Sequence, residues 1–298
     1  MSECHGLVTK NQNGYYSVVS EGRHYLCKVR GKMKRGEQRV LVGDRVSILP
    51  LDDTQAMITS IAPRRNQLLR PPVANLDQAL IVASAASPPI NLPLLDRLIL
   101  MCVSNGITPI LCFTKMDLQP PEMQNILAIY HKLPYDVCPI DYREEQSGEA
   151  VLEALRKRLE GKITIVCGQS GVGKSTLLNS LAGREWFPTQ AISERIGRGK
   201  NTTRHVVIRE LYSASYIADT PGFMSLDYLP SHKEDIANGF YEIGSRQGHC
   251  RFDNCTHRHE PDCKIKAAVD EGQISQERYR SYLLLVAEQE EREREMYR

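Results

Sequence analysis

The sequence has few aromatic residues, little net charge and no long uninterrupted hydrophobic run. Aromatic residues make up 6% of its 298 residues, and 38 Lys/Arg nearly balance 36 Asp/Glu. With 41% hydrophobic and 25% charged residues, the composition excludes collagen-like, disulfide-scaffold and wholly disordered proteins. The longest uncharged stretches, residues 78–95 and 98–114, contain Pro, Asn or Gly and fall short of a membrane span. The length instead suits two or three packed domains.

The first residues also lack the basic segment and apolar run of a signal peptide. We therefore expect a soluble, cytoplasmic protein that needs no membrane partner and acts as a monomer. Six of the nine cysteines are scattered, but Cys250, Cys255 and Cys263 lie within 14 residues of one another. In an intracellular protein such a cluster favours a metal site over disulfides.

Positive charge is concentrated near the N-terminus. Residues 1–65 hold 11 Lys/Arg against 6 Asp/Glu, a net charge of +5, whereas the rest of the chain has a net charge of −3. Strand-like segments at 14–19, 24–29, 40–48 and 56–61 predict a small β-barrel such as an OB-fold, although an SH3-like barrel gives the same pattern. Five basic residues on the loop between two strands can follow a phosphate backbone: Arg30, Lys32, Lys34, Arg35 and Arg39. We predict RNA binding here, with a solvated charged face as the equal alternative.

Residues 66–230 alternate strand-like and helix-like segments. Apolar runs at 79–83, 108–113, 162–167 and 215–218 are typical of strands, and the segments 94–104 and 147–159 are typical of helices. This alternation predicts an α/β domain with a mostly parallel sheet. Residues 231–298 contain the cysteine cluster and helix-forming sequence, and we expect their charged end to fray.

A phosphate-binding motif follows the strand candidate 162–167. The pattern G-x-x-x-x-G-K-[ST] is met by Gly168, Gln169, Ser170, Gly171, Val172, Gly173, Lys174 and Ser175, and Thr176 continues into a helix-like segment. We predict that the backbone N–H groups of this loop hold phosphate oxygens, helped by the positive end of the helix. Lys174 is expected to reach the β- and γ-phosphates, and Ser175 to ligate Mg²⁺.

Two weaker motifs follow along the chain. Asp219 to Gly222 fits D-x-x-G directly after a strand candidate, where an Asp can hold Mg²⁺ through water. Between the two phosphate motifs lies a basic stretch at 197–204, in which Thr202 or Thr203 is a candidate for a switch threonine near the γ-phosphate. A plain surface loop is the alternative for this stretch.

A base-recognition motif precedes both phosphate motifs. Thr114, Lys115, Met116 and Asp117 match [NT]-K-x-D, in which a carboxylate accepts both N–H protons of the guanine Watson–Crick edge. A strand-end turn without a ligand is the rival interpretation. In Ras-like GTPases this motif comes after the phosphate loop and D-x-x-G, so its early position indicates a circular permutation, which a domain with close termini tolerates.

The cysteine cluster offers the ligands of a metal site. Its three thiols are joined by the imidazoles of His257 and His259, and the C-x4-C-x-H-x5-C spacing supplies four ligands for zinc. Four protein ligands leave no open position for catalysis, so we predict a structural role. A metal-free cluster of buried thiols is the alternative.

Taken together, these residues resemble the RsgA family, also called YjeQ or YloQ, of circularly permuted GTPases that assist small ribosomal subunit assembly. The resemblance spans essentially the whole chain and includes residues 65–78, Thr114–Asp117, the phosphate loop, residues 219–223 and the Cys/His cluster. It implies an N-terminal OB-fold over residues 1–65, a circularly permuted P-loop GTPase domain over 66–230 and a zinc-binding domain with helices over 231–298. It also selects His257 over His259, giving one structural Zn²⁺ held by Cys250, Cys255, His257 and Cys263.

The resemblance further implies GTP and GDP with Mg²⁺ as ligands, and the small ribosomal subunit with its rRNA as partner.

Two residues depart from expected patterns. Phe223 follows D-x-x-G where many GTPases have a water-orienting Gln, so we expect slow hydrolysis that the subunit stimulates. Asn201 stands where the family often has His, and His205 is a substitute candidate. The alternative function is a nucleic-acid-binding module that uses GTP as a structural or regulatory ligand.

Overall fold

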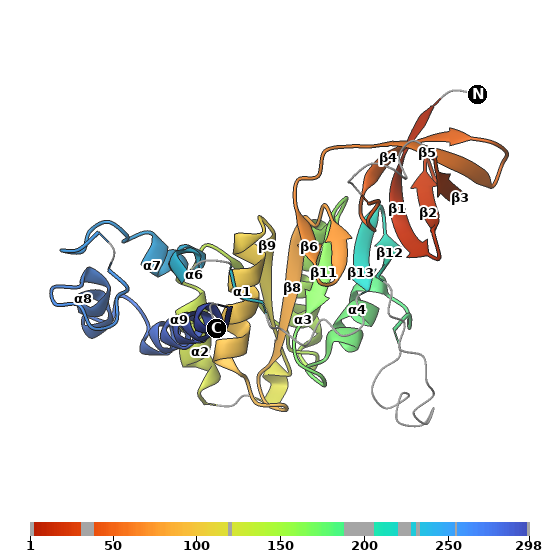
Figure 1. Ribbon diagram of the computed structural model, residues 1–298. Coiled ribbons are helices and arrows are strands. Elements are labelled where there is room, and N and C mark those ends of the chain that lie inside the picture. Colours follow the sequence, from red (N-terminus) through yellow and green to blue (C-terminus); the bar gives the residue numbers. More distant parts are fainter. Residues whose placement is uncertain are drawn as a thin grey trace. The chain divides into compact units, whose positions relative to one another are not determined.

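The computed structural model describes residues 3–30, 39–118, 121–187, 206–219, 228–230, 233–253 and 255–296 (Figure 1). The chain forms two compact units. The first comprises Met1–Leu80, Leu152–Val166 and Lys174–Phe223, and the second comprises Ile81–Val151, Cys167–Gly173 and Met224–Arg298. The domain boundaries expected after residues 65 and 230 stay predictions.

The first unit begins with a closed five-stranded barrel. Its strands are β1 (Cys4–Gln12), β2 (Tyr15–Ser20), β3 (Arg23–Val29), β4 (Arg45–Pro50) and β5 (Gln55–Ile61). They are ordered β1-β2-β3-β5-β4, β3 and β5 run parallel, and β4 pairs with β1 to close the barrel. Alternating residues fill its core, among them Val18, Cys27, Ile48 and Ile58. The strand order is that of an OB-fold, which confirms the predicted barrel and excludes the SH3-like alternative.

The sheet of the first unit continues from the barrel. Its order β11-β13-β12-β1 joins β11 (Ile163–Cys167), β13 (Ser215–Asp219) and β12 (Val207–Tyr212) to the barrel strand β1. Lys10 of β1 is the register partner of Val207 in β12. A hairpin of β6 (Gln67–Leu69) and β7 (Pro72–Ala74) follows the barrel. Gly43 has a φ of +89°, and a Cβ there would lie 2.0 Å from the Ala74 carbonyl oxygen, so the contact requires glycine. The pairing of β1 with β12 makes the barrel part of the same hydrogen-bonded sheet as β11, β13 and β12.

Helices and strands alternate along the α/β part of the chain. α4 (Lys174–Ala182) belongs to the first unit, and α3 (Glu145–Leu159) passes from the second unit into the first. Three further strands are ordered β10-β9-β8: β8 (Gln78–Ser84) passes from the first unit into the second, and β9 (Thr108–Thr114) and β10 (Asp136–Pro139) belong to the second. Every residue of β8 is buried, as expected for a strand that helices cover on both faces.

The helices of the second unit form a second core. They are α1 (Leu92–Ser104), α2 (Met123–Tyr130), α6 (Lys233–Gly239), α7 (Tyr241–Gly244), α8 (Lys264–Asp270) and α9 (Gln276–Met296), with a 3-10 turn, η2, at Met116–Leu118. α1 packs against α9, α6 and β9 (Figure 1). Phe240, Ile243, Tyr282 and Leu285 lie in this core. Among the described residues, no helix is both long and apolar enough to span a bilayer.

The charged C-terminal segment, for which we expected fraying, is helical as far as the structure describes it. It continues α9 to Met296, and two of its glutamates are paired outside the helix. Glu288 pairs with Arg97 of α1, and Glu290 lies 2.6 Å from the Arg258 guanidinium. These ion pairs hold the segment against the rest of the second unit.

Candidate nucleotide site and metal centre

The predicted phosphate loop has the backbone that its motif requires. Residues Gly168–Gly173 leave the end of β11, and Lys174, Ser175 and Thr176 are the first residues of α4. Gly168 has a φ of +137°, and a Cβ at this position would lie 2.0 Å from the Val82 carbonyl oxygen. Glycine is therefore needed both for the conformation and for the close approach to β8. The loop ends at a helix N-terminus, and the N–H groups of a helix's first turn attract anions.

The base motif is hydrogen-bonded to this loop, although 58 residues separate them. Thr114 ends β9, is buried, and its hydroxyl oxygen lies 2.5 Å from the Val172 carbonyl oxygen, to which it donates. The Lys115 ammonium donates to the carbonyl oxygens of Gly171, at 2.9 Å, and of Ser87. Lys115 itself has a left-handed φ of +58°. Two of the motif's four side chains thus fix three loops relative to one another.

Asp117, the predicted guanine acceptor, lies in η2 beside an arginine. Its Oδ2 is 3.1 Å from Nε of Arg143, and the Asp117 side chain is 17% exposed while that of Arg143 is 73% exposed. The Asp141 carboxylate accepts a hydrogen bond from the Arg143 N–H. Nothing in the sequence singled out Arg143, whose guanidinium pairs with the Asp117 carboxylate in the fold.

Asp219, predicted to bind magnesium, is the last residue of β13. β11 and β13 run parallel with Ile165 opposite Ala218, so Asp219 ends its strand where β11 ends. Its carboxylate is 3.7 Å from the Arg209 guanidinium. The other predicted phosphate-side residues, Thr202, Thr203 and Gly222, lie outside the described residues, as do Asn201, His205 and Phe223.

The predicted RNA-binding residues are described only in part. Arg30 follows β3, is exposed, and its N–H donates to the Ile58 carbonyl oxygen of β5. Arg39 is exposed, and its carbonyl oxygen accepts a hydrogen bond from Arg64. Lys32, Lys34 and Arg35 lie outside the described residues. The two arginines mark both ends of the predicted basic loop on the barrel.

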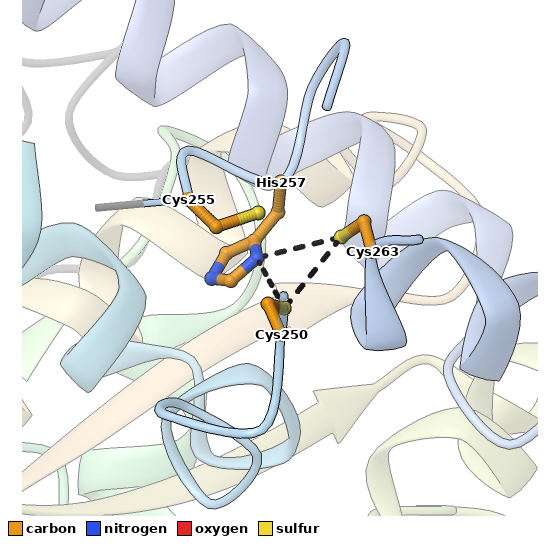
Figure 2. Close-up of side chains that lie close together, drawn as sticks. All are labelled: Cys250, Cys255, His257 and Cys263. Carbon is orange, nitrogen blue, oxygen red and sulfur yellow. Dashed lines mark hydrogen bonds between the residues drawn. The ribbon is translucent and has the colours of Figure 1, made fainter. Parts of the chain in front are cut away.

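The structure brings together the four predicted metal ligands (Figure 2). The ligand atoms of Cys250, Cys255, His257 and Cys263 all lie within 4.8 Å of one another. His257 Nδ1 is 3.6 Å from Cys250 Sγ and 3.5 Å from Cys263 Sγ. His259, the other imidazole of this segment, is exposed. Such a set of three thiols and one imidazole is compatible with a tetrahedral zinc site.

The electrostatics of the cluster also suit a metal ion. Burial raises the pKa of the Cys255 thiol to about 12, and the adjacent Cys250 and Cys263 thiols contribute to this shift. Burial lowers the pKa of His257 and so favours the neutral imidazole that binds metals. Three thiolates this close repel one another because they carry like charges. A divalent cation bound between them would offset this charge and so compensate for their deprotonation.

Comparison with known proteins agrees with this geometry. The family model described as RsgA GTPase matches residues 61–229, and the one described as RsgA N-terminal domain matches residues 5–58. The chain is 38% identical over 299 residues to the small ribosomal subunit biogenesis GTPase RsgA of Caldanaerobacter subterraneus subsp. tengcongensis, covering 100% of both chains. It is 40% identical to the protein of that name from Geobacillus kaustophilus, covering 96% of this chain and 98% of the relative.

Two solved structures share the fold. YjeQ from Thermotoga maritima is similar with a TM-score of 0.82 and 30% identity, covering 97% of this chain and 99% of the other. YloQ, described as a circularly permuted GTPase, has a TM-score of 0.80 and 32% identity, covering 98% and 96%. The early base motif, the phosphate loop bonded to it and these full-length similarities lead to one conclusion: the chain belongs to the RsgA GTPase family.

Proposed function

We propose that this protein is a GTP hydrolase that binds the small ribosomal subunit, assists its late maturation and is stimulated by it. The observation that carries the nucleotide part is the hydrogen bond from Thr114 to Val172, which holds a guanine-type motif against a phosphate loop. The name of the relatives, small ribosomal subunit biogenesis GTPase, supports the choice of subunit.

In this proposal the phosphate loop, Gly168 to Thr176, holds the nucleotide phosphates. Backbone N–H groups of the loop and the α4 N-terminus face the anion, and the Lys174 ammonium neutralises charge on the β- and γ-phosphate oxygens. Ser175, Asp219 and either Thr202 or Thr203 hold Mg²⁺, with Gly222 near the γ-phosphate. When bound, Mg²⁺ neutralises negative charge that develops as the γ-phosphate is transferred to water.

Guanine selectivity is assigned to Asp117. Its carboxylate accepts both guanine N–H protons, whereas adenine does not present that pair of donors. Asp117→Asn should weaken GTP binding and favour xanthosine nucleotides, whose edge has an acceptor in place of the amino donor. Displacement of a labelled GDP by GTP, XTP and ATP measures this change. Equal displacement by ATP and GTP from the unchanged protein would contradict the assignment.

The barrel is proposed as the rRNA contact, through Arg30, Lys32, Lys34, Arg35 and Arg39. For each phosphate that a protein cation neutralises, the affinity should fall by roughly 0.7–0.9 log units per tenfold rise in salt, so binding should weaken steeply with salt.

The protein is further proposed to act as a cytoplasmic monomer. The Cys/His cluster is proposed to hold one structural Zn²⁺ through Cys250, Cys255, His257 and Cys263, because all four positions come from the protein.

The decisive experiment measures GTP turnover of the full chain alone, with small subunits and with large subunits. Small subunits should raise turnover by about 10³–10⁵-fold, the scale of partner stimulation in GTPases with an incomplete site. Equal stimulation by both subunits would contradict the proposed partner. Subunit binding that needs GTP but causes no turnover would instead support the module that uses GTP as a regulatory ligand.

The role of the barrel is best tested by charge changes. Deleting residues 1–65 would also remove the pairing of β1 with β12, so a loss of function would be ambiguous. Alanine at all five basic positions should reduce subunit affinity and flatten its salt dependence. Replacement of Lys132 and Lys157, exposed lysines outside the barrel, is the control and should change neither. Unchanged affinity in the barrel variant would favour a solvated charged face.

A further inference from the structure

The segment between the metal ligands has a carboxylate at its centre. Glu260 lies between His257 and Cys263 in sequence but outside the set of ligands. Its Oε1 accepts hydrogen bonds from the Thr256 N–H, at 2.7 Å, and the Thr256 hydroxyl, at 2.6 Å. Its Oε2 accepts from the N–H groups of Arg258, at 2.9 Å, and His259, at 3.1 Å. One side chain therefore gathers the backbone on both sides of His257.

This arrangement holds a backbone conformation that His257 does not favour by itself. His257 has a φ of +60°, in the left-handed region that residues with a Cβ rarely adopt. The donors on Glu260 come from residues 256, 258 and 259, so the chain must curl around the carboxylate with the imidazole-bearing residue at the bend. The curl turns the His257 imidazole toward the Cys250 and Cys263 thiols (Figure 2).

The carbonyl groups of the same turn are held by α9. The Tyr279 hydroxyl donates to the His257 carbonyl oxygen at 2.6 Å, and the Tyr282 hydroxyl donates to the Thr256 carbonyl oxygen at 3.1 Å. Glu260 thus satisfies donors of the turn while α9 satisfies its acceptors. Of these contacts, only those of Glu260 come from within the loop that carries the ligands.

The chemistry of the site calls for a carboxylate. Its two oxygens meet four donor groups, and an ionised carboxylate has only acceptors to offer. Partial burial raises the pKa of the Glu260 carboxyl, but the hydrogen bonds from Thr256 and Arg258 lower it overall to about 2. A glutamine would turn an NH₂ group toward N–H donors, and an aspartate is one methylene short.

We propose that Glu260 is a positioning residue for the metal centre, which shapes the 256–259 turn so that His257 and Cys255 can meet the other two ligands. The proposal rests on the proposed zinc site. Residues that orient metal ligands typically change metal affinity by about 10–100-fold when they are replaced.

The test uses the full chain, with Glu260→Gln as the main variant and Asp262→Asn as the matched control. Asp262 is a carboxylate of the same loop whose pair with Arg251 is exposed. Zinc affinity is measured by competition with a chromophoric chelator, and ligand geometry by the absorption spectrum of the Co²⁺-loaded protein. Glu260→Gln should weaken zinc binding by about 10–100-fold and alter the Co²⁺ bands. Asp262→Asn should leave both unchanged.

A second variant guards against a general loss of folding. Thr256→Val removes one of the four donors and should give a smaller loss of zinc affinity, while GDP binding, measured in parallel, stays intact. Zinc affinity and Co²⁺ spectra of Glu260→Gln equal to those of the unchanged protein would overturn the proposal and leave the zinc site standing. Unchanged protein that binds no zinc would overturn the metal site and this proposal together.

Discussion

Arg278 on α9 and Asp96 on α1 form an ion pair that is almost fully buried. Arg278 Nη1 lies 2.6 Å from Asp96 Oδ1, and the side chains are 2% and 0% exposed. The same guanidinium binds both carboxylate oxygens of Glu242, and the Tyr130 hydroxyl donates to Asp96. Burial lowers the pKa of Arg278, but Asp96 and Glu242 outweigh this effect and raise it. A single arginine therefore joins α1, α7 and α9.

Replacing Arg278 by Met should lower the free energy of unfolding by about 3–5 kcal/mol, because two buried carboxylates then lose their counter-charge. Urea unfolding followed by circular dichroism measures this loss. Arg294→Met is the control: its pair with Glu290 on the surface of α9 is exposed and long, at 3.9 Å, so the change should cost only about 0.3–0.5 kcal/mol. Equal stability of the two variants would contradict the role given to Arg278.

Glu288 should make the stability of the second unit depend on pH. Hydrogen bonding and charge from Arg97, together with Arg292, hold the pKa of Glu288 below its ordinary value of 4.5. A lowered pKa in the folded state means that the ionised carboxylate stabilises the fold above the unfolded pKa, and that this stability is lost as the pH falls toward the folded pKa. The urea midpoint of the unchanged protein should therefore exceed that of Glu288→Gln by the largest amount near neutral pH. This difference should shrink below about pH 4.5. A difference that does not vary with pH would contradict this expectation.

The parts of the molecule predicted from sequence are those with local signals. β2, β3 and β5 follow from alternating residues, and the phosphate loop follows from glycine spacing between a strand and a helix. The metal ligands are likewise close in sequence, and the structure places the four named residues together. β1 was not predicted as a strand, because its second half, ending in Asn11 and Gln12, is too polar for a clear alternating pattern.

The parts that could not be predicted depend on partners far apart in sequence. The pairing of β1 with β12 joins residues almost 200 positions apart, and Arg278 meets Asp96 across 182. Fraying was expected for the end of α9 because its charges look solvated, whereas Arg97 and Arg258 hold it. Arg143 and Glu260 are ordinary charged residues in the sequence, and only the folded loops show what they bind.

Gly168→Ala should weaken nucleotide binding by at least about tenfold, which corresponds to about 1.4 kcal/mol. The added Cβ would lie 2.0 Å from the Val82 carbonyl oxygen and would push the start of the phosphate loop away from β8. Titration with fluorescently labelled GDP and GTP measures the affinity. Gly161→Ala is the matched control, since Gly161 also has a positive φ, +70°, but a Cβ there meets nothing within 4 Å. Equal affinities of the two variants would show that the approach to Val82 is not needed for binding.

Removing the metal should open the cysteine loop while the barrel stays folded. Without a cation, the Cys250, Cys255 and Cys263 thiols must be protonated or repel one another, and the turn that Tyr279 and Tyr282 hold loses its anchor. After treatment with a chelator under reducing conditions, hydrogen exchange should become faster across residues 250–263 and stay unchanged in β2 and β3. Cys255→Ser should behave like the chelated protein and lose its zinc, whereas Cys4→Ser, a thiol of the barrel, should keep it. Slow exchange across the loop after chelation would show that buried thiols alone hold it, since a structural metal contributes its binding energy directly to folding.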